Sequence, residues 1–310
     1  MQLLRLVGIL LICVTTEIFS QNTFEFLRVD MSPRAAALGG SFSASGDDAD
    51  VIFHNPAGLK LLQEMPISIS YLNHLLDINF ASISISKKFD NSSSFGAAIK
   101  YANYGTFTKA DDFGNRSSEY GANDVALIIG YAGEIDENFY YGANAKFIYS
   151  GIESYSSTAA AVDLGVYYII PSEQLNISFS VLNLGAQLSS YISTKESLPI
   201  DVNIGFAKKL THLPLRLFLD FNRIQESEDG IISRLNNFSI GGEFTLSKVL
   251  RLRAGYDNQK RKELKVGTFA GLAGFNIGLG IVIKEYIFNY AYSSMGQIGT
   301  LHRIGVNTTL

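Results

Sequence analysis

The stretch "NFYYGANAKFIYS", from Asn138 to Ser150, alternates between two kinds of side chain. One set of alternate positions is apolar, with aromatic residues at both ends: Phe139, Tyr141, Ala143, Ala145, Phe147 and Tyr149. Successive side chains of a β-strand point to opposite faces, so this pattern predicts a strand with one apolar face. Aromatic residues at both ends of that face, with small residues between them, are typical of a lipid-facing strand of a transmembrane barrel.

Fourteen segments of this kind run from residue 66 to residue 310. They begin near Ile67, Asn79, Phe95, Asn123, Phe139, Ala159, Asn176, Ile200, Leu215, Phe238, Leu250, Phe269, Tyr286 and Leu301. The charged side chains fall on the face opposite the apolar one: Lys146, Asp163, Asp201, Arg216, Asp220, Glu243, Arg251, Arg253 and Arg303. A Lys or Arg facing the lipid midplane would cost about 2–4 kcal/mol. The sequence therefore predicts an all-β protein, a transmembrane antiparallel β-barrel of 14 strands with these charges in its lumen.

The connections between the segments are unequal in length. The even-numbered ones are short, as in "GEIDE", "IPSEQ", "LSKV" and "KEY". Four odd-numbered ones are long: Tyr104–Tyr120, Leu184–Pro199, Arg223–Asn236 and Asp257–Thr268. This asymmetry is typical of an outer-membrane barrel, and an even strand number places both termini on the periplasmic side. A secreted sandwich or propeller would also alternate, but it needs neither aromatic ends nor unequal loops.

The first residues predict export. Arg5, the apolar run "LVGILLICV" and the following polar residues have the order of a signal peptide over residues 1–20. Beyond residue 20 no run of 18 apolar residues could form a spanning helix. Cys13, the single cysteine, lies in the signal, so disulfides and cysteine-ligated metals are not expected. The formal net charge of −4 gives no reason to expect nucleic acid as a partner.

Residues 21–65 do not alternate and precede the first predicted strand. They are polar and rich in Gly, Ala and Ser, so we expect a hatch, or plug, inside the barrel lumen; a disordered periplasmic tail is the alternative. Within "HNPAGLKLL", Pro56 would fix a turn and Gly58 would permit close approach of the backbone. We expect Asn55 and Pro56 to lie inside the barrel.

Two sets of residues carry a resemblance to known families. Asn55, Pro56, Ala57 and Gly58, ahead of a 14-strand barrel, resemble the hatch motif of the FadL family of outer-membrane proteins. The stretch "TFEFLRVDMSPRAAALGG", with "YANYGTF" and "AKFIYSGIESYSSTAAAVDLG", is similar to the PorQ family, FadL-like proteins of the type IX secretion system of Bacteroidetes. That similarity extends from about residue 23 to the C-terminus. In the N-terminal stretch it includes Phe24, Phe26, Pro33, Arg34, Gly39 and Gly40.

The resemblance implies a non-enzymatic component of an attachment complex in the outer membrane. The implied partners are a PorZ-like surface protein, a PorU-like sortase, a PorV-like shuttle, and the lipid and anionic lipopolysaccharide of the membrane. Two other functions remain open: a PorV-like cargo shuttle and a FadL-like transporter of hydrophobic small molecules. A transporter would need an apolar groove and a kinked strand, and the sequence identifies no such kink.

The search for catalytic chemistry supports a non-enzymatic protein. The four histidines, His54, His74, His212 and His302, are far apart and lack the paired spacing of metal ligands. In "GDDAD", from Gly46 to Asp50, a calcium-loop register would place Ile52 at a ligand position, so we expect a solvated or hatch-internal acidic turn. The lumen charges could form an acid–base site or a pore filter, but a network that holds the hatch is favoured. We therefore predict no catalytic residue, metal or cofactor.

Overall fold

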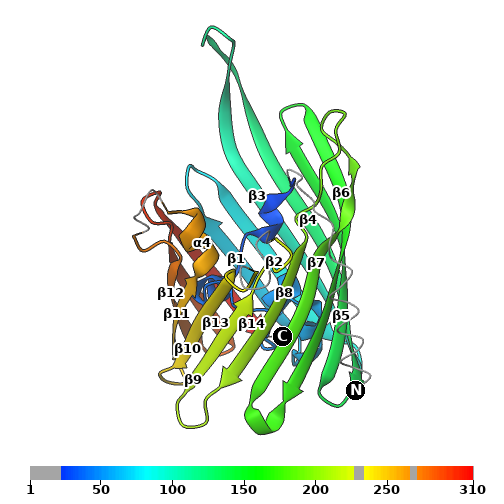
Figure 1. The fold of residues 1–310 in the computed structure, drawn as a ribbon, viewed down its shortest axis with the longest axis vertical. Helices are drawn as coiled ribbons and strands as arrows, with labels where there is room; N and C mark the ends of the chain where they lie inside the picture. The colour runs from blue at the N-terminus through cyan, green and yellow to red at the C-terminus, as the bar shows by residue number, and fades with distance from the viewer. Residues whose placement is uncertain (1–21, 227–233, 266–270, 310) are drawn as a thin grey trace.

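The computed structural model describes residues 22–226, 234–265 and 271–309, and these form a closed barrel of 14 antiparallel strands (Figure 1). Each strand pairs with the next in sequence, and the last pairs with the first. The predicted 14-strand transmembrane barrel is therefore confirmed. The strands are β1 (Pro66–Asn73), β2 (Asn79–Lys88), β3 (Ser93–Ala110), β4 (Arg116–Asp136), β5 (Phe139–Ile152), β6 (Tyr155–Ile170), β7 (Leu175–Ser189), β8 (Asp201–Lys209), β9 (Leu215–Phe221), β10 (Phe238–Thr245), β11 (Leu250–Asp257), β12 (Phe275–Ile283), β13 (Tyr286–Ser294) and β14 (Thr300–Thr309).

The predicted strand starts lie within two residues of the observed ones, except in β4, β6 and β12. β4 begins seven residues before Asn123, and β6 begins four residues before Ala159. The predicted start at Phe269 lies outside the described residues, and β12 begins at Phe275.

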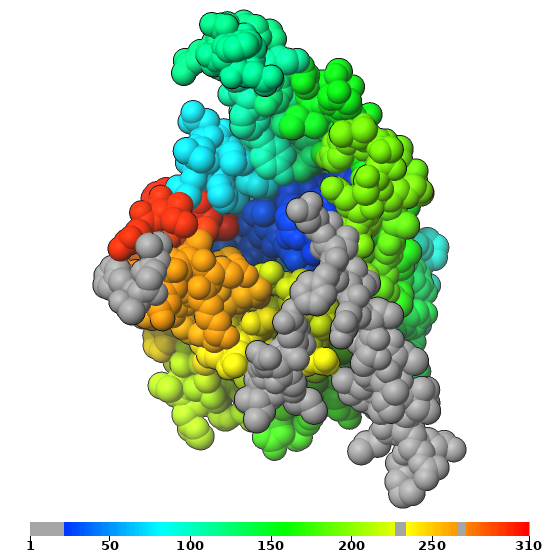
Figure 2. All heavy atoms as spheres, turned by 45° about the horizontal axis from the view of Figure 1, so that its top comes forward, coloured from blue at the N-terminus to red at the C-terminus, as the bar shows by residue number. Residues whose placement is uncertain are grey.

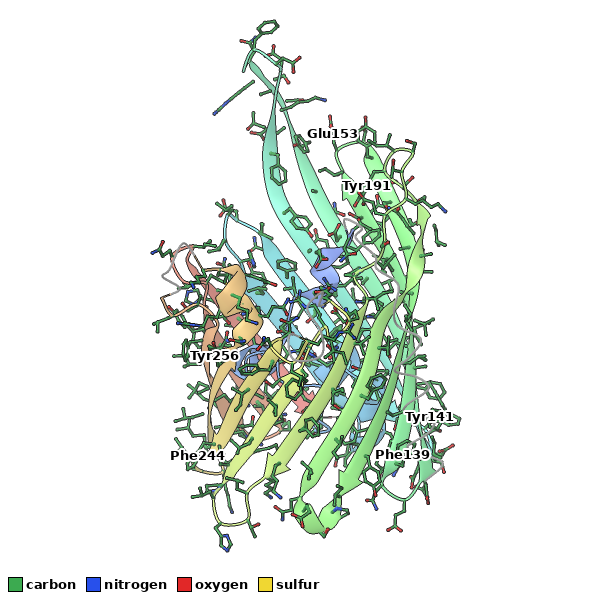
Figure 3. The ribbon with its side chains drawn as sticks, in the orientation of Figure 1. Phe139, Tyr141, Glu153, Tyr191, Phe244 and Tyr256 are labelled. Atoms are coloured by element: carbon green, nitrogen blue, oxygen red, sulfur yellow. The ribbon has the colours of Figure 1, made fainter. Side chains whose placement is uncertain are left out.

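The outer face of the barrel is apolar and carries aromatic residues near both ends. In β5, Phe147 and Tyr149 are exposed on this face, whereas Asn144, Lys146 and Ile148 are buried on the lumen side. Phe139, Tyr141 and Phe244 lie near the short-turn end in Figure 3. Neighbouring rings contact one another around the barrel, with 5.3 Å between the ring centroids of Phe95 and Tyr131 and 5.0 Å between those of Tyr256 and Phe275. This alternation explains why the charged residues fall on one face.

The barrel wall is uneven in height, because β3–β7 have 14 to 21 residues and β8–β14 have 7 to 10. β3 and β4 form a hairpin that rises above the rest of the rim (Figure 1). The prediction of a long loop over Tyr104–Tyr120 is therefore wrong, since strands occupy all of it except residues 111–115. Thr, Phe and Tyr favour strands, and beyond the bilayer a strand needs no continuous apolar face.

Two other predicted loops contain regular secondary structure. Residues Leu184–Ser189 belong to β7, and helix α4 (Asn258–Glu263) occupies half of the predicted loop Asp257–Thr268. Asp257 caps this helix, with its carboxylate accepting from the amides of Gln259 and Lys260. The predicted loop Arg223–Asn236 lies partly outside the described residues, and the proposed signal peptide and Leu310 lie wholly outside them.

The N-terminal segment, residues 22–65, lies inside the barrel and is called the hatch below (Figure 1). It contains four short helical turns: η1 (Glu25–Arg28), α2 (Pro33–Ala37), η2 (Ala49–Phe53) and η3 (Pro56–Leu61). A further turn, η4 (Pro171–Glu173), joins β6 to β7. In the part of the chain that the structure describes, no helix is long and apolar enough to cross a membrane. Phe24, Phe26 and Met31 of the hatch pack on Leu72 and Ile148 of the wall, so part of the hydrophobic core lies between hatch and wall.

Candidate functional site

The turn from Asn55 to Gly58 joins the hatch to the barrel wall. Asn55 caps η3, since its Oδ1 accepts from the amide of Ala57 at 3.0 Å, and Pro56 occupies the first helical position. Its Nδ2 donates to the carbonyl of Val166 in β6 at 3.1 Å. Asn55 and Ala57 are both fully buried, so the hydrogen bond between them is shielded from water, whereas Val166 is half-buried.

Two glycines of the wall make room for this turn. Gly142 in β5 and Gly165 in β6 are directly opposite each other in the barrel ladder. A Cβ on Gly142 would lie 2.4 Å from the carbonyl carbon of Pro56, and one on Gly165 would lie 2.0 Å from Oδ1 of Asn55. Because real Cβ atoms do not approach so closely, this wall surface is shaped to the Asn-Pro turn.

A second hatch turn meets a second glycine pair across the lumen. Pro33 begins α2, and Gly39 and Gly40 follow it with φ of 73° and 85°, a conformation that glycine adopts without strain. Opposite this turn, Gly241 in β10 pairs with Gly255 in β11. A Cβ on Gly255 would lie 2.2 Å from the backbone nitrogen of Gly39. The hatch is therefore fitted to opposite sides of the wall.

Arg34 is the buried centre of an ion-pair cluster between hatch and wall. Its guanidinium makes two hydrogen bonds of 2.8 Å to Glu243 in β10 and two, of 2.9 and 3.2 Å, to Asp47 of the hatch. Arg216 in β9 donates to the same Asp47 at 2.8 Å, and Arg253 in β11 donates to Glu243 at 2.6 Å. Three of the predicted lumen charges thus meet the hatch in one network. Arg251, also predicted for the lumen, is half-buried and has no ion pair among the described residues.

The hatch carboxylates in this cluster titrate in opposite directions. Burial alone would raise the pKa of Asp47, but Arg34 and Arg216 outweigh it and hold this pKa far below its ordinary value. Burial and the neighbouring charge of Asp50 raise the pKa of Asp48 to about 7. Asp48 lies 3.6 Å from Arg34, which opposes this shift without cancelling it. The motif "GDDAD" is thus an acidic turn inside the hatch, in which Asp47 is strongly paired with arginine and Asp48 only weakly.

Asp220 of β9, another predicted lumen charge, binds the hatch backbone. Its Oδ2 accepts from the amides of Phe42 and Ser43 at 3.0 and 2.9 Å. Next to it, the hydroxyl of Tyr167 in β6 donates to the carbonyl of Ala44 at 2.5 Å. Backbone groups of a segment without regular structure must find partners when they are buried. The wall supplies these partners, so a hatch without long helices can remain ordered.

Lys146 and Asp163 form a buried ion pair of 2.8 Å beside an irregularity in β7. The ladder between β6 and β7 shifts register between Val162 and Leu164, and Asn183 takes a left-handed conformation with φ of 60°. The sequence identified no such irregularity. Asn183 closes this irregularity. Its backbone NH donates to Asp163 at 2.8 Å, its side-chain oxygen accepts from Lys146 at 2.7 Å, and its side-chain nitrogen donates to the carbonyl of Pro199 at 2.9 Å.

Further contacts between hatch and wall were missed by the sequence analysis. Lys100 in β3 donates to the carbonyls of Leu27 and Val29, and Asn144 in β5 donates to that of Ile52. Asp50 accepts from the hydroxyls of Ser68 and Ser84 in β1 and β2. The face assigned to each wall residue was readable from its alternation. Its hatch partner was not, because that partner lies in a segment without periodicity.

A polar cavity of about 110 Å³ lies above the hatch, toward the long-loop end. Charged side chains from the hatch, the wall and α4 line it: Arg28, Asp30, Lys100, Lys146, Asp201 and Lys260. Looking into this end, Figure 2 shows the hatch atoms in blue at the floor of the opening. Such a lining does not suit an apolar ligand. Among the described residues, no group of three or more His, Cys, Asp or Glu side chains is placed to hold a metal ion.

Comparison with solved structures identifies the architecture. A Pseudomonas aeruginosa FadL homologue superposes with a TM-score of 0.59 at 10% identity, over 91% of this chain and 99% of that one. The monoaromatic hydrocarbon channel CymD gives 0.58 at 11% identity, over 94% and 99%. The Pseudomonas putida toluene transporter TodX gives 0.56 at 12% identity, over 94% and 98%.

The chain has a FadL-like fold. At these identities the likeness concerns the fold alone. No protein-family profile matches the sequence, and no curated protein matches it.

Proposed function

We propose that this protein is a non-enzymatic outer-membrane barrel that acts as an anchor for a surface-exposed partner. The observation that carries the proposal is the filled lumen. The hatch is bonded to wall strands all around the barrel, including β6 through Asn55, β9 through Asp220 and β10 through Arg34. With its interior occupied in this way, the protein would act through its outer surface.

The orientation follows from the unequal ends of the barrel. The long connections and the tall β3–β4 hairpin would face the cell exterior, and the short turns and both termini would face the periplasm. The resemblance to the PorQ family suggests the partner: a PorZ-like protein that works with a PorU-like sortase and a PorV-like shuttle. In this role the barrel would help to attach secreted cargo to anionic lipopolysaccharide.

The second candidate is a transporter of hydrophobic small molecules. The FadL-like fold favours it, because two of the compared structures are described as a toluene transporter and a monoaromatic hydrocarbon channel. The irregularity of β7 at Asn183 would be the point where a lateral route could open. However, Asp163, Lys146 and Asn183 close that point with buried polar contacts, and the cavity above the hatch is polar.

Deletion of the gene in its own host would separate the two candidates. For the anchor, secreted cargo should appear in the medium instead of on washed cells, and uptake of labelled toluene should not change. Expression of the wild-type chain should restore attachment. If cargo stays attached while toluene uptake falls, the anchor proposal is wrong and the transporter is favoured.

A further inference from the structure

The six short connections at one end of the barrel divide into a basic group and an acidic group. Four of them, β2–β3, β8–β9, β10–β11 and β12–β13, carry exposed lysines, counted with the adjoining strand ends: Lys87, Lys88, Lys209, Lys248 and Lys284. We call residues 87–92, 209–214, 246–249 and 283–286 the basic turns. Asp90 and Glu285 are the only acidic residues in these four stretches of sequence, so lysines outnumber carboxylates in the basic turns.

The other two short connections, β4–β5 and β6–β7, are acidic and lie next to each other in the barrel. With the adjoining strand ends they carry Glu134, Asp136, Glu137 and Glu173. Two lysines from other elements pair with them, Lys60 of the hatch with Glu134 at 3.5 Å and Lys208 of β8 with Glu173 at 3.1 Å. The short-turn rim therefore has opposite charges on its two sides.

The protein does not neutralise the lysines of the basic turns. Within the part of the chain that the structure describes, none of these five lysines forms an ion pair, although Lys208 on the same rim does. Asp90, the carboxylate nearest in sequence to Lys87 and Lys88, accepts instead from the backbone amides of Ser92 and Ser93 at 2.7 Å. Four neighbouring connections thus present unpaired positive charge to their surroundings.

Apolar side chains project from the same turns. Phe89, Leu213, Leu246 and Val249 are 73%, 52%, 49% and 53% exposed. Phe89 contacts the ring of Phe95 on the outer face, with 5.6 Å between the ring centroids, and Lys87 lies directly opposite Phe95 in the β2–β3 ladder. Lysine beside exposed apolar residues suits the boundary between hydrocarbon and headgroups, because its stem contacts apolar groups while its ammonium reaches phosphates.

The length of the strands places three of the basic turns at this boundary. The strands β8–β13, which these turns connect, have 7 to 9 residues. A tilted strand needs about 9–11 residues to cross the hydrocarbon of a bilayer. Because this wall has no length to spare, the basic turns at its end lie at the level of the headgroups.

We propose that the basic turns bind the anionic headgroups of phospholipids in the periplasmic leaflet of the outer membrane. A lysine close to an anionic membrane surface contributes about 1 kcal/mol of attraction, whereas the acidic connections β4–β5 and β6–β7 would be repelled. Binding is therefore one-sided and holds the wall from β8 through β14 to β2 at this leaflet. The inference goes beyond the anchor function, and it takes only the name of the leaflet from the orientation proposed above.

Tryptophan fluorescence in lipid vesicles tests this surface, because the chain contains no tryptophan of its own. Phe244→Trp places a reporter beside the β10–β11 turn, and Phe139→Trp places a matched one beside the acidic β4–β5 connection. Both positions lie on the outer face near the short-turn end (Figure 3). The vesicles consist of phosphatidylcholine and phosphatidylglycerol. Brominated chains, which quench tryptophan, are carried either by the phosphatidylglycerol or by an equal amount of the phosphatidylcholine.

We expect brominated phosphatidylglycerol to quench the Phe244→Trp reporter about threefold more than brominated phosphatidylcholine does. The Phe139→Trp reporter should show no preference for phosphatidylglycerol. Adding Lys209→Gln and Lys248→Gln to the Phe244→Trp chain should abolish its preference. Adding Lys195→Gln and Lys265→Gln instead, at two exposed lysines of the opposite end, removes the same charge and should leave the preference unchanged.

Equal quenching of the Phe244→Trp reporter by the two lipids would overturn the proposal. The same preference at both reporters would also overturn it, as would a preference that survives the loss of Lys209 and Lys248. Both leaflets of such vesicles have one composition, so the orientation in which the barrel inserts does not affect the result. Retention or release of cargo after gene deletion leaves this inference unchanged, so it and the anchor function can fail separately.

Discussion

At the residue scale, Asn55 caps η3 of the hatch through its Oδ1 and bonds the wall through its Nδ2. Asn55→Ala would leave the fully buried amide of Ala57 and the half-buried carbonyl of Val166 without these partners. We expect the free energy of unfolding to fall by about 1–3 kcal/mol. The heat-modifiable gel shift, followed through a urea titration in detergent, would measure it. Asn123→Ala, at an exposed position of β4, should leave the titration midpoint unchanged; equal midpoints for both variants would contradict the bonded role of Asn55.

Asp48 should make stability depend on pH, because burial and Asp50 raise its pKa to about 7. In the unfolded chain this carboxyl would ionise near its ordinary pKa of about 4. Ionised Asp48 therefore destabilises the folded state fully above pH 7, and this cost decreases as the pH falls from 7 to 4. Asn at this position can still accept from the amide of Asp50 and from Asn307, which lie 3.1 and 2.9 Å from Asp48.

The variant Asp48→Asn should accordingly be more stable than the wild type at pH 8, by roughly 2 kcal/mol, and the difference should vanish near pH 4. Urea titrations at both pH values would measure it. Asp112→Asn, in the exposed turn of the hairpin, is the control and should show no such pH-dependent gain. A loss of stability at pH 8 would mean that the attraction between Asp48 and Arg34 outweighs the cost of burial.

At the scale of elements, alternation predicted the strands in the membrane and failed above it. In β5, lipid on one side and hatch on the other force apolar and polar residues to alternate, so the start of the strand at Phe139 was identified, and the predicted stretch ends two residues before the strand does. Above the rim both faces of β3 and β4 meet water, and the residues between Tyr104 and Tyr120 lose this contrast. Their strand structure comes from cross-strand hydrogen bonds and β-propensity, which leave a weaker signal in the sequence.

The hatch was the least predictable element, for a different reason. Its Asn55–Pro56 turn could be recognised locally, and the lumen side of Lys146, Asp220 and Glu243 followed from alternation. The pairing of Arg34 with Glu243 spans 209 residues and depends on how the hatch is placed within the closed barrel. No local pattern encodes such a contact.

Substitution of glycines in the wall tests directly whether the hatch is fitted to them. Gly241 and Gly242 are neighbours in β10, but a Cβ on Gly241 would lie 2.6 Å from the carbonyl oxygen of Leu38, whereas one on Gly242 would meet Leu215 at an ordinary 3.5 Å. Gly241→Ala should displace the turn after α2 and cost about 1–3 kcal/mol. Trypsin should then cleave the folded protein after Arg34, which is 3% exposed in the native structure. Gly242→Ala should stay resistant, and equal resistance of both variants would mean that the wall adapts to the added methyl group.

At the scale of the whole molecule, the hatch stays in the lumen and blocks it because buried charges of hatch and wall are paired with one another. Arg34→Ala would leave the buried Glu243 with Arg253 alone and the exposed Asp47 with Arg216 alone. Removing one member of a buried ion pair typically costs about 3–5 kcal/mol. The hatch leaves the wall more readily when its contacts weaken. The equilibrium between barrels with a blocked lumen and barrels with an open lumen should therefore shift at least a hundredfold toward the open lumen.

Planar bilayer recordings would measure this shift as stepwise conductance that is frequent in Arg34→Ala and rare in the wild type. Arg251→Ala is the matched control, because Arg251 lies on the same face of β11 as Arg253 but forms no ion pair among the described residues. It should remain as silent as the wild type. If Arg34→Ala is equally silent while trypsin reaches its hatch, the hatch can loosen without opening a path, and the lumen is closed by packing against the glycine pairs.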